Sequence, residues 1–278
     1  MNFKKVFSLI VMIIFLFGCQ SVNPVLEIHI IDVGQGDSIL IKTPQNKTIL
    51  IDAGDEKSDY LVINYLNKQQ IKEIDILIAS HFDSDHIGGL DNVIDNFSVK
   101  SVYAPDDNYD TSSFNNFFLA CEKKDLSIQT IKRGDFIEVE KDITLNILSP
   151  NIITSNSNAN SIVLSFDFIN KSFLFTGDME KSNELELINS SLIENINFLK
   201  VSHHGSYTAT SEEFISYITP DVSVISCGYK NSYGHPHRSV LETLEKYNSL
   251  IYRTDISGNL VFYSDGDIIY TKDDYLKK

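Results

Sequence analysis

The segment at residues 80–89, S-H-F-D-S-D-H-I-G-G, constrains the fold and chemistry of this chain more than any other. It carries four side chains that can bind a metal ion: His81, Asp83, Asp85 and His86. The apolar run 74–79 before it predicts a buried strand, and apolar residues after Gly88-Gly89 predict a helix to about residue 96. Imidazole and carboxylate ligands on one strand-to-helix loop indicate a divalent metal site. A solvated acidic turn with two incidental histidines is disfavoured by this density of ligands.

Two further groups of possible ligands also end predicted strands. Gly177-Asp178 closes the strand expected at 172–176, and His203-His204 follows the strand expected at 197–201. A strand-ending turn explains a lone Gly-Asp, whereas two adjacent histidines beside a glycine are rarely core residues. Strand ends at one edge of a sheet sandwich can meet in space although they are far apart in the sequence. We therefore expect the three groups to form one site.

The order of the predicted elements indicates an α/β (α+β) domain built in two halves. Each half reads as strands followed by helices, which fits two α/β layers packed sheet to sheet. The polar, asparagine-rich stretch 149–160 separates the halves. The aromatic stripe of the helix expected at 111–124 is interpreted as core rather than as a base-stacking surface.

Several of these motifs carry a family resemblance. H-x-D-x-D-H-x-G-G resembles the H-x-H-x-D-H signature of the metallo-β-lactamase superfamily, with Asp83 in place of the second histidine. Together with I-D-V-G-Q-G-D-S-I-L at 31–40 and I-L-I-D-A-G at 49–54, it looks like the metallo-hydrolase domain of ComEC-type DNA-uptake proteins. This resemblance implies a four-layered αββα sandwich, a metallo-β-lactamase-like hydrolase domain, over residues 25–272.

The resemblance also implies a set of metal ligands and a preferred metal. One ion would bind His81 and Asp83, the other Asp85 and His86, with Asp178 bridging both and one of His203 and His204 completing the second site. The Asp52-Ala53-Gly54 loop would lie beside the metals. Asparagines, Asn158 and Asn160, stand where the superfamily has a further histidine. This ligand set implies two divalent ions. Because oxygen donors replace imidazoles, manganese or magnesium is favoured over zinc.

These ligands point to hydrolysis of a phosphodiester. Two metals can lower the pKa of a bridging water and neutralise charge on the substrate, with Asp85 and Asp178 as the catalytic carboxylates. The turn 233–238, which opens a helix, provides a phosphate seat in His235, His237 and Arg238. The alternative is that this turn only caps a surface helix.

Net charge narrows the functional classes. The chain has 38 acidic and 23 basic residues and a formal charge of −15, which argues against a nucleic-acid binder that works through bulk charge. We expect a metal-dependent phosphodiesterase that acts on DNA. The alternatives are a metallo-hydrolase of a small ester, lactam or nucleotide, and a non-catalytic DNA-receptor lipoprotein. No stable protein partner can be inferred.

The N-terminal residues predict export. Lys4-Lys5 precede an apolar run at 6–17 that is too short to span a membrane, and the run ends in L-F-G-C at 16–19. This end resembles a bacterial lipobox, which implies a signal peptide at 1–19, lipidation of Cys19 and a tether at 20–24. The mature chain would then sit on the outer face of the cytoplasmic membrane, or be secreted if Cys19 is not lipidated. Whether Cys121 and Cys227 pair is left open.

Overall fold

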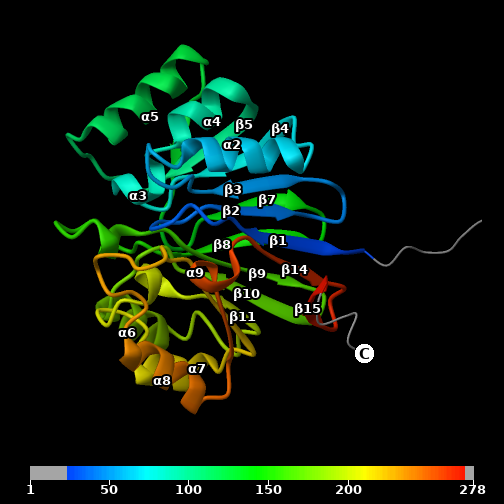
Figure 1. The fold of residues 1–278 in the computed structure, drawn as a ribbon, viewed down its shortest axis with the longest axis vertical. Coiled ribbons are helices and arrows are strands. Elements are labelled where there is room, and N and C mark those ends of the chain that lie inside the picture. Colours follow the sequence, from blue (N-terminus) through cyan, green and yellow to red (C-terminus); the bar gives the residue numbers. More distant parts are fainter. Residues whose placement is uncertain (1–23, 273–278) are drawn as a thin grey trace, which may run out of the picture.

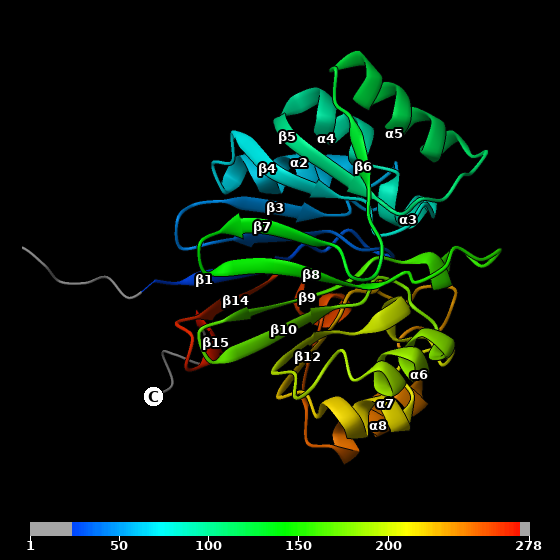
Figure 2. The ribbon, with the colours of Figure 1, turned by 180° about the vertical axis from the view of Figure 1, so that it is seen from behind.

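Two mixed β-sheets stacked face to face form the centre of the molecule. A computed structural model of the 278-residue chain describes residues 24–272. The strand orders are β15-β14-β1-β2-β3-β4-β5-β6 and β13-β12-β11-β10-β9-β8-β7. Helices α2, α4 and α5 cover the outer face of the first sheet, and α6, α7 and α8 cover that of the second (Figures 1 and 2). The αββα arrangement expected from the sequence is confirmed.

The first half supplies six strands of one sheet and the helices that cover it, together with two strands of the other sheet. In chain order they are β1 Leu26–Ile30, β2 Ile39–Lys42, β3 Thr48–Ile51, α2 Asp59–Lys68, β4 Glu73–Ile78, α3 Ser84–Ile87, α4 Leu90–Asn96, β5 Ser98–Ala104, α5 Ser112–Lys123, β6 Ile128–Thr130, β7 Phe136–Glu140 and β8 Ile143–Ser149.

The second half completes both sheets. Its elements are the 3₁₀ helix η1 Asn158–Asn160, β9 Val163–Phe168, β10 Lys171–Phe175, α6 Lys181–Ser190, β11 Phe198–Lys200, the 3₁₀ helix η2 Ser202–Gly205, α7 Glu212–Ile218, β12 Val222–Ile225, α8 Arg238–Lys246, β13 Leu250–Arg253, α9 Thr254–Ser257, β14 Leu260–Ser264 and β15 Ile269–Thr271. The predicted strands and longer helices are found with their ends shifted by a residue or two. The single-turn helices α3 and α9 are too short to show a period.

Parallel pairing brings the ends of distant strands to one edge. In the first sheet β3, β4, β5 and β6 run parallel, and in the second β10, β11, β12 and β13 do so. Their carboxyl ends therefore meet at the same edge of each sheet, and the connecting loops gather there. In Figure 1 this edge carries α3, and β1 enters from the opposite edge.

Three apolar clusters hold the layers together. The largest fills the space between the sheets and includes Ile28, Phe166, Phe173 and Phe198. The other two pack the helices onto the outer faces of the sheets. In the predicted aromatic stripe, Phe114 and Phe117 are buried against Phe82, whereas Phe118 is partly exposed. The stripe is thus mainly core, as expected.

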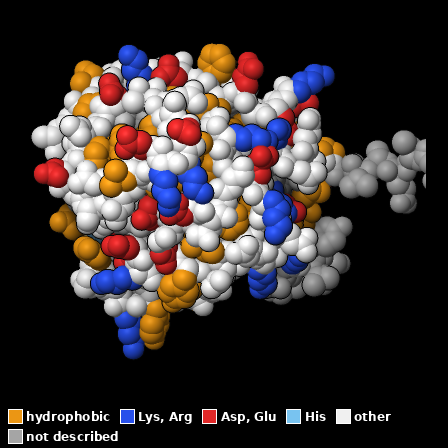
Figure 3. Space-filling view, turned by 90° about the horizontal axis from the view of Figure 1, so that it is seen from above, with side chains coloured by type: hydrophobic (Ala, Val, Ile, Leu, Met, Phe, Trp, Pro, Cys, Tyr) orange, Lys and Arg blue, Asp and Glu red, His pale blue; other side chains and the backbone are white. Residues whose placement is uncertain are grey.

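Some N-terminal predictions lie outside the described residues. These are the signal peptide at 1–19, the lipidation site Cys19 and most of the tether at 20–24. Within residues 24–272, no helix is both long and apolar enough to cross a membrane. Cys121 and Cys227 are free, buried thiols, which answers the open question of their pairing. On the face seen from above the molecule, acidic and basic side chains are interspersed (Figure 3).

Candidate metal centre

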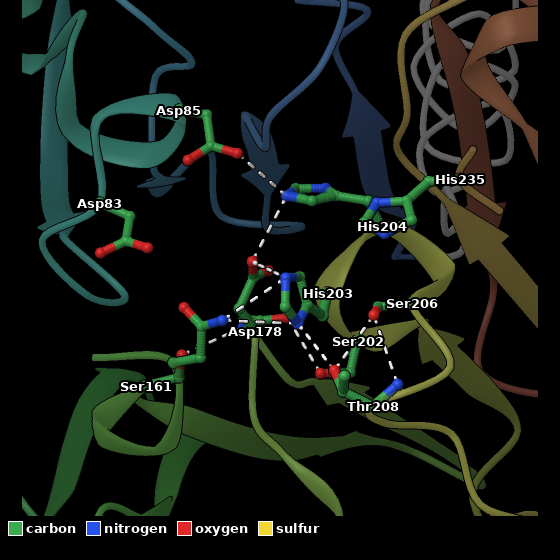
Figure 4. A network of polar contacts seen from close by, with 12 residues as sticks. Asp83, Asp85, Ser161, Asp178, Ser202, His203, His204, Ser206, Thr208 and His235 are labelled. Carbon is green, nitrogen blue, oxygen red and sulfur yellow. Dashed lines mark hydrogen bonds and ion pairs between the residues drawn. The ribbon is translucent and has the colours of Figure 1, made fainter. Parts of the chain in front are cut away.

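The predicted ligands meet at the edge of the two sheets where the strand ends gather. His81 and Asp83 lie on the loop between β4 and α3, whereas Asp85 and His86 belong to α3. Asp178 follows β10, and His203 and His204 lie in η2 after β11. Figure 4 shows Asp85, His204, His203 and Asp178 converging from these separate elements, with Asp83 nearby. The three groups found at strand ends therefore form one site.

The distances within the cluster match those between ligands of one metal ion. His86 Nε2 lies 3.3 Å from Asp178 Oδ1 and 3.3 Å from His204 Nε2. His204 Nε2 lies 3.4 Å from both Asp178 Oδ2 and Asp85 Oδ2. Ligands about 2.0–2.2 Å from a divalent ion are separated by about 3–3.5 Å. These donors therefore fit a divalent metal.

Buried polar atoms without a hydrogen bond support the same conclusion. Asp37 Oδ1, His81 Nε2 and Asp178 Oδ1 are buried and make no hydrogen bond within the described part of the chain. A buried polar atom without a partner carries a free-energy penalty of about 1–3 kcal/mol, and it is rare in native proteins. Two of these atoms belong to predicted metal ligands, so binding a cation would satisfy them.

A network of hydrogen bonds orients the imidazole of His86. Its Nδ1 lies 2.8 Å from Asp52 Oδ2, and the same carboxylate accepts hydrogen bonds from the Ser80 hydroxyl at 2.6 Å and the Ser80 amide at 2.8 Å. A carboxylate on the far nitrogen of a histidine turns the other nitrogen toward the metal and raises its basicity. The Asp52-Ala53-Gly54 loop thus lies beside the cluster, as the family resemblance implies.

The backbone of η2 separates the roles of the two adjacent histidines. His203 and His204 have positive φ angles of 48° and 54°, which are uncommon outside glycine and concentrate at functional sites. His204 is buried, and its Nδ1 lies 3.1 Å from the Ser226 carbonyl oxygen. His203 is partly exposed, 3.7 Å from Asp178 Oδ2 and 3.3 Å from Glu180 Oε1. His204 therefore completes the tight cluster, and His203 lies at its rim.

Asp37 belongs to the cluster but was not predicted. One ligand atom each from Asp37, His86, Asp178 and His204, all buried, can be chosen within 4.8 Å of one another. Asp37 Oδ1 lies 3.4 Å from His204 Nδ1, and Oδ2 lies 2.8 Å from the fully buried Lys200 Nζ. The sequence signals for this pair are weak: Asp37 is an acidic residue after a glycine turn, and Lys200 is a lysine within an apolar strand. No local pattern joins two residues so far apart.

The buried carboxylates of the cluster are stabilised by nearby positive charge. Burial opposes ionisation of Asp178, but the imidazoles of His204 and His86 hold its pKa well below the usual value. Burial likewise opposes charging of His86 and His204, but Asp178 and neighbouring carboxylates raise the pKa of both imidazoles well above normal. Burial, reinforced by His86, lowers the pKa of His81. A divalent metal would supply the charge that these carboxylates need, and His81 is held in the neutral form that a ligand requires.

The remaining first-loop residues lie toward the opening of the site. The Asp83 carboxylate lies 3.8 Å from His81 Nε2 and accepts a hydrogen bond of 2.5 Å from the Ser157 hydroxyl. Burial raises the pKa of Asp85, but the histidines His204 and His86 outweigh it and lower the value to about 2. Asp85 is therefore an anion at neutral pH.

The asparagines of the inter-half loop have different surroundings. Asn158 Nδ2 lies 3.4 Å from His203 Nε2, at the rim of the cluster. Asn160 is buried and donates to Asp107 Oδ2 at 2.6 Å, so it holds the loop in place.

Only part of the predicted phosphate seat reaches the cluster. The ring of His235 lies 5.7 Å from that of His203 and 6.3 Å from that of His204. The His237 ring lies 5.0 Å from His235, one step further out, and its Nδ1 accepts a hydrogen bond from the Tyr207 amide at 3.2 Å. Arg238 is 91% exposed, and its Nε donates to Glu242 at 2.6 Å. The structure therefore does not bring Arg238 to the cluster.

A close backbone approach joins the two histidine turns. A Cβ on Gly205, whose φ is +81°, would lie 2.6 Å from Pro236 Cβ. The Gly205 carbonyl also accepts a hydrogen bond from the His237 amide at 2.9 Å. A side chain at position 205 would therefore push the His235 to His237 turn away from His203 and His204.

Comparison with known proteins adds independent information. The model of the Metallo-beta-lactamase superfamily matches residues 31–229. The chain is 32% identical over 271 residues to ComE operon protein 3 of Bacillus subtilis, covering 91% of this chain and 34% of that protein. Recombination protein 2 of Haemophilus influenzae is 33% identical, with coverages of 87% and 29%, and Competence protein ComA of Neisseria gonorrhoeae is 28% identical, with 83% and 31%. The chain spans about a third of the length of these relatives.

A solved structure shows the same fold. The metallo-beta-lactamase fold protein YhfI from Bacillus subtilis aligns with a TM-score of 0.56 at 13% identity, covering 87% of this chain and 100% of that chain. The fold, the buried Asp/His cluster and the matched relatives agree with the resemblance found in the motifs, and they support a metal-dependent hydrolase. The chain belongs to the metallo-β-lactamase superfamily and resembles its competence-protein members.

Proposed function

We propose that the chain is a metal-dependent phosphodiesterase that cleaves DNA, anchored by lipid outside the cytoplasm. The observation that carries this proposal is the buried cluster with unpaired donors, which opens onto the half-buried His235 and the turn that follows. Similarity to proteins named for recombination and competence supports a DNA substrate.

In this proposal, different residues bind metal, orient water and bind the phosphate. His81, Asp83, Asp85, His86, Asp178 and His204 would hold two divalent ions, with His203 at the rim and Asp37 beside His204. The ions would supply an activated water and neutralise charge on the phosphodiester. Asp85, ionised and facing the opening, can orient the attacking water. Burial, reinforced by the nearby histidines, lowers the pKa of His235 to about 4. At neutral pH His235 therefore offers a hydrogen bond to the phosphate without a positive charge.

The proposal is tested with metal-depleted protein to which Mn²⁺, Mg²⁺ or Zn²⁺ is added, one metal at a time. Single-stranded DNA, duplex DNA, a cyclic dinucleotide and a chromogenic β-lactam are offered under identical conditions. Cleavage of the phosphodiesters with the lactam untouched is expected. Turnover of the lactam alone would refute the proposal.

The ligand set predicts the preferred metal. Asp83 supplies oxygen where the superfamily has imidazole, and Asn158 lies near the place of another histidine. We therefore expect stronger activation by Mn²⁺ than by Zn²⁺. Asp83→His is expected to move the preference toward Zn²⁺, measured by elemental analysis together with an activity titration. Asp142→His, in the exposed turn between β7 and β8, serves as the control. Full activity with zinc alone in the unaltered protein would contradict this assignment.

Anchoring is proposed from the sequence alone, from the L-F-G-C motif at 16–19. Stable attachment needs more than one acyl chain. Cys19→Ser is expected to abolish metabolic labelling by a fatty acid, with Cys121→Ser as the control. Undiminished labelling of Cys19→Ser would show that Cys19 is not the anchor.

One observation favours a second candidate, a hydrolase of a small ester, lactam or nucleotide. The Arg238 guanidinium pairs with Glu242 and does not line the cluster. The site therefore lacks one of the cations that the sequence predicted for binding a long polyanion such as DNA. The substrate panel described above separates the two functions.

A further inference from the structure

A series of aromatic rings leads from the metal cluster to the surface. The His204 and His235 rings lie 6.3 Å apart, and Tyr233 stacks on His235 at 5.6 Å with an interplanar angle of 25°. On the other side His237 lies 5.0 Å from His235, and Tyr207 lies 4.8 Å from His237. The two outer tyrosines come from different loops, one after η2 and one before α8. Tyr233 contacts His235 directly, and Tyr207 is linked to it through His237.

The outer tyrosines are exposed to a degree that the fold does not require. Tyr207 is 60% and Tyr233 is 65% exposed. Within residues 24–272 neither hydroxyl makes a hydrogen bond, so neither ring is held in place by its polar end. Scattered exposed apolar residues are ordinary, but two large rings joined through histidines to a catalytic cluster form a continuous aromatic surface.

Local positive charge lies along the same rim. Lys230 Nζ lies 5.1 Å from the ring centroid of Tyr229, itself 72% exposed, on the loop that carries Tyr233. Arg238, at the other end of that turn, is paired with Glu242 and adds no free charge to the rim. In a chain with a net charge of −15, flat rings with a lysine on the same loop favour an anionic ligand with planar apolar groups.

We propose that Tyr207 and Tyr233 form a base-stacking subsite that holds the unpaired bases flanking the scissile phosphate of a single-stranded nucleic acid. The proposal rests on the phosphodiesterase function proposed above and names the part of the substrate that the rim recognises. Aromatic side chains stack on any base, because every base has a π-face, so the subsite selects unpaired strands without selecting sequence. In a duplex the bases are stacked on one another, and their faces are not free to meet these rings.

Binding and cleavage are measured separately, so that failure of the subsite is distinguished from failure of the hydrolase function. The full chain loaded with Mn²⁺ is given a fluorescent 12-nucleotide oligothymidylate, and a matched strand with abasic residues at its central positions. Affinity is followed by fluorescence anisotropy under conditions without turnover, and KM and kcat are followed where cleavage occurs. Tyr207→Ala and Tyr233→Ala are compared with Tyr233→Phe, which keeps the ring.

Tyr217→Ala is the matched control. Tyr217 is partly exposed near the end of α7 that leads into the start of β12, whereas the cluster lies at the carboxyl ends of the parallel strands. Its loss is expected to change neither binding nor cleavage.

Each alanine substitution at Tyr207 or Tyr233 is expected to weaken binding of the base-bearing strand by about five- to a hundred-fold more than binding of the abasic strand. Tyr233→Phe should retain the affinity. Equal losses on both strands, or no loss, would overturn the subsite. If the unaltered chain binds no oligonucleotide, the subsite is also overturned, and the rings are left to another occupant such as a protein partner. Tight binding that depends on the rings without cleavage would uphold the subsite and refute the phosphodiesterase.

Discussion

Asp178→Asn is expected to lose nearly all activity on every substrate and to bind less metal. Asp178 is buried between His86 and His204, 3.3 Å from one Nε2 and 3.4 Å from the other, and it is the carboxylate that both predicted metal sites share. Asparagine keeps the shape and removes the charge. Loss of a hydrogen-bonded partner behind a ligand reduces metal affinity or activity by about 10- to 100-fold, and loss of the shared ligand should exceed that.

The measurement combines metal content per chain with the rate on a small phosphodiester. Asp142→Asn, in the exposed turn between β7 and β8, is the matched control and should change neither. Arg238→Ala should also keep its metal, because its guanidinium lies on Glu242. Retention of both metals and full activity by Asp178→Asn would remove Asp178 from the centre.

Asp37→Asn is expected to destabilise the metal-free protein by about 3–5 kcal/mol. Lys200 is fully buried, and its ammonium meets Asp37 Oδ2 at 2.8 Å and the Val201 carbonyl at 3.0 Å. Removing the carboxylate leaves a buried charge without a counter-ion, which is far less favourable than losing both charges. Asp37→Asn combined with Lys200→Met should therefore recover much of the lost stability.

Urea unfolding in the presence of a chelator measures these free energies without a contribution from bound metal. Asp95→Asn is the control, because Asp95 pairs with Lys123 at the exposed surface, where such pairs often contribute nothing measurable. An unchanged unfolding midpoint in Asp37→Asn would mean that Asp37 is not the counter-ion of Lys200. If Asp37 also orients His204, the stabilised double variant should still bind metal more weakly.

Local sequence patterns predicted those parts of the candidate site that lie within short segments of the chain. The strand expected at 74–79 is observed as Glu73–Ile78, and the ligand loop follows it directly. Asp178 and His204 were placed at strand ends, and parallel pairing carries those ends to the same edge. These predictions succeeded because hydrophobic periodicity and strand-ending glycines are recorded within a few consecutive residues.

Other features depend on residues that the chain brings together only when folded. The position of His204 within the tight cluster, with His203 at the rim, depends on two successive left-handed backbone conformations. The residue types in S-H-H-G do not predict these conformations. Asp37 joins the cluster because its loop packs beside α3, where the Asp37 amide donates to the Asp85 carbonyl at 3.2 Å. Arg238 was expected at the phosphate seat, but it meets Glu242 one helical turn away on α8.

The sequence by itself determined the strands, the longer helices and the residue types of the centre, because each is written in short-range periodicity and spacing. Only the tertiary structure decided that β14 pairs with β1 across more than two hundred residues, that Lys200 is neutralised by Asp37, and that the exposed Tyr233 stacks on His235. The physical reason is that pairing, burial and charge compensation between distant segments depend on the packing of the whole sandwich. A linear pattern cannot record that packing.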